Sequence, residues 1–157
     1  PDAHCLPLHP VQLWFHPQPR KLIQTAREVV MLAESNGGTR QIFTDGRALP
    51  KAEDVQPWWY GYSIGRWEGN AFVVETSGFN DKSWLDDYGH PHSEALKTTE
   101  RFVRRDVGHM DVTITIEDPK YYTKPWSAKL PFRLNPDTDL IEDICDNEKD
   151  SQHQVGK

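Results

Sequence analysis

Residues 96–117, LKTTERFVRRDVGHMDVTITIE, carry the clearest structural pattern in the chain. In their second half Val112, Ile114 and Ile116 alternate with polar residues, which is typical of a half-buried β-strand. The first half alternates in the same way, and DVG at residues 106–108 separates the two halves as a turn. The stretch therefore predicts a β-hairpin, and with it an all-β fold.

Similar short runs continue on both sides of this hairpin. We expect strands at residues 21–25, 28–33, 39–44, 60–67, 71–77, 128–134 and 139–145. Turn residues separate several of them, such as SNGG at 35–38 and EGN at 68–70, where Gly and Asn allow positive φ. Evenly spaced hairpins predict an antiparallel meander of about 8–10 strands that closes into a barrel, because closure removes exposed edges. A two-sheet sandwich is the alternative.

The two ends differ from the middle of the chain. Residues 1–20 hold five of the 12 prolines, and proline stiffens the backbone and cannot donate to a strand ladder. We therefore expect an extended Pro-rich arm at 1–20, a β-barrel domain at 21–147 and a polar tail at 148–157.

Charge and hydropathy restrict the partners. The net charge is -6 and no stripe of Lys and Arg is present, which argues against a nucleic-acid partner. No run of about 18 apolar residues occurs, so we expect no membrane span. The two cysteines, Cys5 and Cys145, could form a disulfide or remain two buried thiols, and spacing alone does not decide between them.

The best candidates for chemistry are His90, His92 and Glu100. Two histidines at i and i+2 on an extended backbone point to the same side, and histidine titrates near neutral pH. One hypothesis is an acid–base site in which Glu100 orients His92 and His90 makes a second contact. The alternatives are a metal site that uses His90 and His92 for Zn or Cu, or an exposed loop whose histidines only pack locally.

Four further residues are candidates for ligand binding. Trp59, Tyr62 and Trp84 could stack on a ligand at the barrel mouth, although core packing also explains such aromatic residues. Arg66 could bind the ligand or pair with Glu100, because a carboxylate inside a barrel needs a partner.

Four strings in the chain resemble a known family. They are RQIFTDGR at 40–47, GYSIGRWEGNAFVVETSGFNDKSWLD at 61–86, GHPHSEALKTTERF at 89–102 and YTKPW at 122–126. Together they resemble a family of uncharacterised bacterial exported proteins. The resemblance implies a periplasmic or secreted protein whose signal peptide was removed before Pro1. An oxidising compartment favours the disulfide between Cys5 and Cys145. The expected barrel is also similar in architecture to lipocalin-like (calycin) domains.

These observations predict an exported β-barrel that binds a small molecule. An enzyme of this kind would be an isomerase, lyase or hydrolase that acts by acid–base chemistry on a polar, carbohydrate-like substrate. The alternatives are a non-catalytic ligand carrier, a His-ligated metalloprotein, and an assembly subunit that exchanges its arm within a homo-oligomer. Apart from the metal of the third alternative, no cofactor is expected.

Overall fold

The computed structural model describes residues 5–143 and residue 145. One short helix, α1 (Pro10–Phe15), precedes the sheet, and two 3-10 turns, η2 (Ser35–Gly37) and η3 (Ala52–Asp54), lie in the loops. The strands are β1 (Arg20–Gln24), β2 (Glu28–Ala33), β3 (Thr39–Phe43), β4 (Tyr62–Glu68), β5 (Ala71–Ser77), β6 (Lys97–Arg104), β7 (His109–Glu117) and β8 (Trp126–Arg133). The all-β prediction is confirmed.

The strands form a single 8-stranded sheet in the order of the sequence. Each neighbouring pair is antiparallel except β3 and β4, which run parallel and pair only at Ile42↔Ser63 and Phe43↔Ile64. The pure meander is thus wrong at this point, because the long connection at 44–61 turns the chain so that β4 begins beside the last residues of β3 and runs in the same direction. A parallel pair requires such a crossover.

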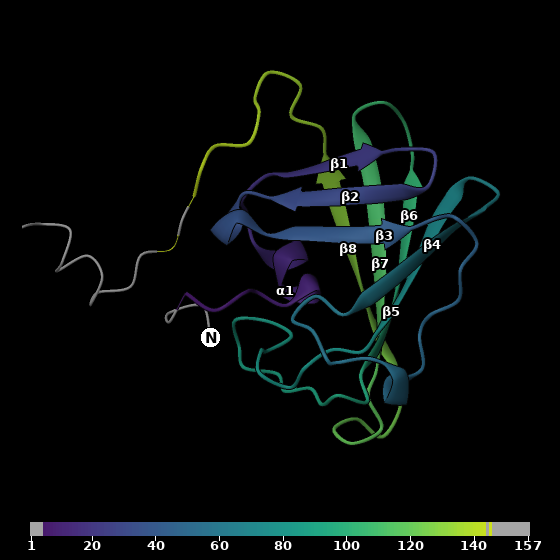
Figure 1. Ribbon diagram of the computed structural model, residues 1–157. Coiled ribbons are helices and arrows are strands. Elements are labelled where there is room, and N and C mark those ends of the chain that lie inside the picture. The colour runs from purple at the N-terminus through teal and green to yellow at the C-terminus, as the bar shows by residue number, and fades with distance from the viewer. Residues whose placement is uncertain (1–4, 144, 146–157) are drawn as a thin grey trace, which may run out of the picture.

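The sheet curls into a half-barrel and does not close. Figure 1 shows β1, β2 and β3 running across the steeper strands β4 to β8. The edge strands β1 and β8 do not pair with each other in the register of the sheet. The expected closed barrel is therefore wrong, and a lipocalin-like identity stays a prediction. Segment 134–143 follows β8 without forming a strand, so the strand expected at 139–145 is also wrong over the described residues.

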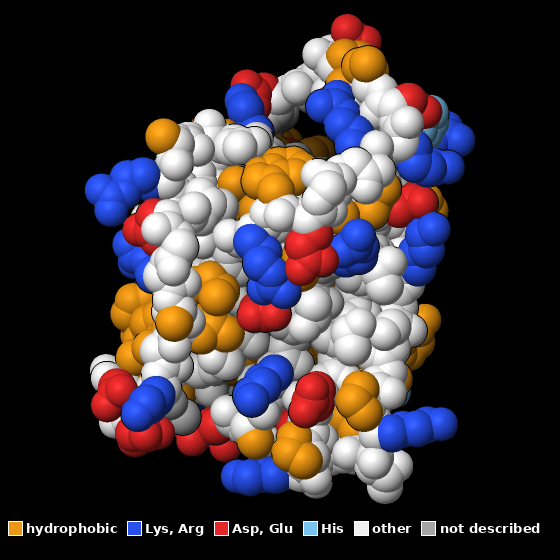
Figure 2. All heavy atoms as spheres, turned by 90° about the vertical axis from the view of Figure 1, so that its right-hand side faces the viewer, with side chains coloured by type: hydrophobic (Ala, Val, Ile, Leu, Met, Phe, Trp, Pro, Cys, Tyr) orange, Lys and Arg blue, Asp and Glu red, His pale blue; other side chains and the backbone are white. Residues whose placement is uncertain are grey.

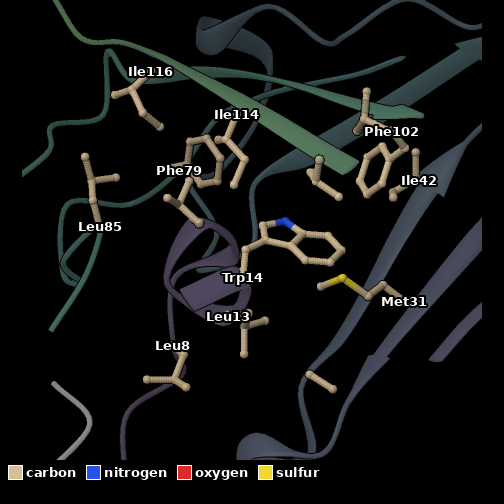
Figure 3. Packing of buried hydrophobic residues seen from close by; sticks show 14 of the residues in the cluster. Leu8, Leu13, Trp14, Met31, Ile42, Phe79, Leu85, Phe102, Ile114 and Ile116 are labelled. Atoms are coloured by element: carbon tan, nitrogen blue, oxygen red, sulfur yellow. The ribbon is translucent and has the colours of Figure 1, made fainter. Parts of the chain in front are cut away.

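The prediction of an extended arm at 1–20 is wrong over residues 10–15, which form α1. His9 caps this helix by accepting a hydrogen bond from the Val11 N–H at Nδ1, and Pro10 occupies the first turn, where its missing N–H costs nothing. The helix lies on the concave side of the sheet (Figure 1). Figure 3 shows Trp14 projecting from it into the core, between Met31 and Phe102.

Local patterns explain the long hairpin that dominates the sheet. Burial alternates along β6, and the inward residues of β7, Val112, Ile114 and Ile116, are buried as their alternation predicts. The turn between β4 and β5 uses Gly69 at φ 61°, a conformation that glycine adopts without steric cost.

A disulfide joins Cys5 to Cys145 across 140 residues, which confirms the pairing favoured by the family resemblance. The segment between β8 and Cys145 is held by two contacts. Asp139 Oδ1 accepts a hydrogen bond from Lys21 Nζ at 2.8 Å, and the Ile141 N–H donates to Glu34 Oε2 at 3.1 Å. These contacts hold the segment beside β1 and β2. The predicted tail at 148–157 lies outside the described residues.

The outer face over β4, β5 and β6 carries charges of both signs. Arg66 pairs with Glu75 at 3.0 Å and with Glu68 at 2.9 Å, and Arg101 pairs with Glu68 at 3.0 Å. Figure 2 shows acidic and basic side chains interspersed on the face it presents. In the described part of the chain, no helix is long and apolar enough to cross a membrane.

Candidate functional site

Glu100 lies inside the half-barrel at the centre of a buried polar cluster. Its carboxylate accepts two hydrogen bonds from Arg40, at 3.0 Å from Nη1 and 2.5 Å from Nη2, and one of 2.5 Å from Trp14 Nε1. Arg40 also donates to the hydroxyls of Ser63 at 3.0 Å and Thr76 at 2.7 Å. The side chains of Arg40 and Glu100 are each only 1% exposed.

This cluster joins α1 to β3, β4, β5 and β6. A buried ion pair is tolerated only when its donors and acceptors are satisfied, and here both carboxylate oxygens and three guanidinium nitrogens have partners. The sequence left open whether Glu100 faces inward or outward, and the structure places it inward with an arginine partner. That partner is Arg40 rather than Arg66, because Arg66 points outward to Glu68 and Glu75.

A second buried cluster contains two histidines. The rings of His9 and His92 lie 4.6 Å apart between centroids, and His9 also lies 4.6 Å from Phe79. Both histidines are almost completely buried. Burial lowers the pKa of His9 well below its usual value, and the nearby His92 and Arg40 lower it further. Burial also lowers the pKa of His92, partly offset by a hydrogen bond to Ser93 and by Asp118 and Asp81.

The hydrogen bonds of His92 define its tautomer. Nδ1 lies 3.4 Å from the Ser93 carbonyl oxygen, which can only accept, so we assign the proton of the neutral ring to Nδ1, and Nε2 then accepts from the Ser83 hydroxyl at 3.0 Å. A hydroxyl bound to a neutral imidazole is a pair that can perform general-base chemistry. However, Ser83 is only 3% exposed, and neither it nor His92 lines either of the two cavities described below.

His90 is separated from the other two predicted catalytic residues. Its side chain is 54% exposed, and Nδ1 binds Asp86 Oδ2 at 2.6 Å. The residues around it form no strand, so the side chains at i and i+2 do not share a face: His90 is exposed and His92 is buried. Glu100 is bound to Arg40 and Trp14, so the hydrogen bonds around it and around His92 form separate sets. Among the described residues, no group of three or more His, Cys, Asp or Glu side chains could hold a metal ion.

The predicted ligand-binding residues are dispersed. Tyr62 stacks on Trp58 at 4.7 Å between ring centroids, and both line a cavity of about 320 Å³ on the outer side of β3. Trp59 is half-buried, whereas Trp84 is 46% exposed. Neither of these, nor Arg66, lines a cavity described here.

A larger cavity, of about 510 Å³, opens between the edge strands. We call it the seam cavity. Its walls come from residues 17–22 around β1, from the turn between β6 and β7, and from the end of β8 with segment 134–140. Trp14 and Phe132 contribute aromatic walls, and their rings meet edge to face at 5.4 Å between centroids. The volume lies within the range of about 300–1,000 Å³ that is typical of small-molecule sites.

Arg20 is the central charged group of the seam cavity. Its guanidinium lies 5.4 Å from the ring centroids of both Trp14 and Phe132. One Nη donates to the His16 carbonyl oxygen, and Nε is buried without a hydrogen-bond partner. Burial lowers the pKa of Arg20 to about 10, which leaves the group cationic at neutral pH.

The sequence did not predict this site. Trp14, Arg20 and Phe132 were not among the candidate residues. The cavity-lining segments are separated by most of the chain and meet only because the sheet curls. The one local signal is Arg20 itself, a charge at the start of a short strand directly after the Pro-rich run.

Comparison of the chain with family models, with curated proteins and with solved structures finds no match.

Proposed function

We propose that the protein is an exported, non-catalytic binding protein that holds a small organic molecule in the seam cavity. The observation that carries this proposal is the cavity itself, a space of about 510 Å³ at the open edge of a half-barrel. Its walls combine the aromatic rings of Trp14 and Phe132 with the aliphatic side chains of Leu22 and Met110. Apolar walls with few polar groups are typical of ligand pockets.

The buried polar groups support binding rather than catalysis. Glu100 uses both carboxylate oxygens to bind Arg40, and one of them also accepts from Trp14, so it is not free to orient a base. His92 contacts Ser83 deep in the protein, away from the seam cavity. A general base must come within hydrogen-bond reach of its substrate. The hydrogen bonds of Glu100 and Arg40 instead link α1 to four strands of the half-barrel.

The disulfide supports the proposal of export. Bonds such as that between Cys5 and Cys145 persist in oxidising compartments, including the bacterial periplasm and the extracellular space. This agrees with the resemblance to exported proteins. We propose a periplasmic or secreted carrier on these two grounds.

Binding of a neutral fluorescent dye, N-phenyl-1-naphthylamine, tests the site without relying on charge. We expect saturable binding at one site per chain. The variant Met110→Trp fills the cavity from β7 and should weaken this binding by about tenfold or more, which corresponds to about 1.4 kcal/mol. Thr113→Trp is the matched control, because it places the same ring on the same strand outside the cavity lining.

The dye titration has two outcomes that would refute the proposal. One is the absence of saturable binding to folded wild-type protein. The other is an equal loss of affinity in Met110→Trp and Thr113→Trp, which would place the dye elsewhere. Circular dichroism of each variant establishes that the sheet is intact.

A further inference from the structure

We infer that the ligand of the seam cavity is an organic anion with an apolar body, such as a carboxylate, and that Arg20 binds its charged group. The inference rests on the proposed function and specifies the ligand class. It comes from the hydrogen bonds of Arg20, from the charges around the cavity and from the nature of its walls.

Arg20 is a partly buried cation whose Nε is buried and which has no anionic partner among the described residues. Within residues 5–143 and 145, no carboxylate forms a salt bridge with it, and its Nε has no hydrogen-bond acceptor. Buried charges in proteins are normally paired, because removing a charge from water is costly. Arg40, which is completely buried, follows this rule by binding Glu100. A ligand anion at Arg20 would complete the same type of pair.

The charge around the cavity is opposite to that of the whole chain. The protein has a net charge of -6. The ionised side chains that line the cavity are nevertheless mainly cationic: Arg20, Lys21, Arg104 and Arg133, against Asp139 alone. Asp139 is already bound by Lys21, and Arg104 donates to the carbonyl oxygens of Asp106 and Val107. Cationic groups gathered around an apolar space raise the local concentration of anions.

The walls near Arg20 define the rest of the ligand. Trp14 and Phe132 flank the guanidinium at equal distances of 5.4 Å, so a group bound to Arg20 lies beside two aromatic rings. Leu22, Met110 and Leu140 add aliphatic surface to the lining. A small inorganic anion would leave most of this surface without contacts, whereas an acyl chain or an aromatic ring would cover it. The forked guanidinium is suited to a planar carboxylate, which it can bind through two nitrogens.

Matched acids and alcohols separate charge from shape. Decanoate with 1-decanol, and 2-naphthoate with 2-naphthalenemethanol, are each titrated against the bound neutral dye. Because hydrogen bonds to charged groups are stronger than those between neutral groups, we expect at least one acid to bind about tenfold or more tightly than its alcohol. In Arg20→Met, which keeps a long side chain without charge, this preference should fall below about twofold. Arg27→Met is the control, because Arg27 is 77% exposed and lies outside the cavity lining.

The outcomes distinguish this inference from the proposed function. If the dye binds but acids and alcohols bind the wild-type protein equally, the cavity is a site and the anion inference is wrong. An acid preference that survives in Arg20→Met also overturns the role of Arg20. If the dye does not bind at all, the proposed function itself fails. The wild-type comparison needs no variant, so it remains decisive even if Arg20→Met does not fold.

Discussion

Mild acid should destabilise this protein through its two buried histidines. His9 and His92 are held neutral in the folded state, because burial lowers both pKa values. For His9 the cause is also geometric: Nδ1 accepts the Val11 N–H that caps α1, so a proton on Nδ1 would break the cap. In the unfolded chain both imidazoles titrate freely near about pH 6.5.

Proton linkage gives the sign and the size of the change in the free energy of unfolding with pH. A depressed folded-state pKa means that the unfolded state binds more protons below about pH 6.5, so stability is full above that pH and falls as the pH is lowered through it. Between pH 7.5 and 5.5 one histidine that stays neutral when folded contributes a loss of about 1.4 kcal/mol. The expected loss is therefore about 1.4 kcal/mol from His9 and up to about 2.7 kcal/mol if His92 also remains neutral.

Urea denaturation at pH 7.5, 6.5 and 5.5 measures this loss as a change in the free energy of unfolding. The variant His9→Asn keeps a side-chain oxygen for the helix cap but cannot be protonated in this range. It should lower the pH-dependent loss by about 1.4 kcal/mol. Leu13→Val is the control, because it alters a buried residue of the same helix without a titrating group. If His9→Asn and Leu13→Val show the same pH dependence as the wild type, the reasoning about His9 is refuted.

Three further changes should alter stability. Arg40→Met leaves a buried carboxylate unpaired and should cost about 3–5 kcal/mol in urea denaturation, whereas Arg66→Met, at a half-exposed pair, should cost less than about 1 kcal/mol; equal costs would contradict the buried-pair assignment. Replacing Cys5 and Cys145 by serine should cost about 2–5 kcal/mol, and an unchanged thermal midpoint would contradict this. Gly65→Ala places a Cβ 2.4 Å from an aromatic carbon of the core and should cost about 1–3 kcal/mol; a wild-type urea midpoint would show that the core yields freely.

Local patterns predicted the parts of the fold that depend on neighbouring residues. Alternating residues such as those of β7 and turn residues such as Gly69 both favour antiparallel hairpins, so the all-β class followed from them. The helix α1 was missed because it has only six residues and a histidine cap, and because proline suggested an extended arm. Its stability comes from Trp14 in the core, which is a tertiary contact.

The features that depend on distant parts of the chain could not be predicted. The parallel pairing of β3 with β4 depends on where the 44–61 connection returns, and it places Arg40 on the inner face beside Ser63, within reach of Glu100. Arg66 lies on the opposite face, because the β4 residue aligned with Glu100 through Val74 is Gly65. The seam cavity depends on how strongly the sheet curls, because the curl determines the gap that remains between the edge strands β1 and β8. Glu100 and His92 were identified as candidates for chemistry but their burial was not predicted, whereas Arg20 became a candidate only once the cavity around it was known.

The disulfide has a consequence for what a protease can do to the chain. Because Cys5 and Cys145 bracket the sheet and the seam cavity, one cut in any exposed loop between them leaves both fragments in a single covalent molecule. Such a nicked chain retains all eight strands, and its fragments separate only after reduction. A protein of this kind can lose the continuity of its backbone and still keep the two edges of its half-barrel together.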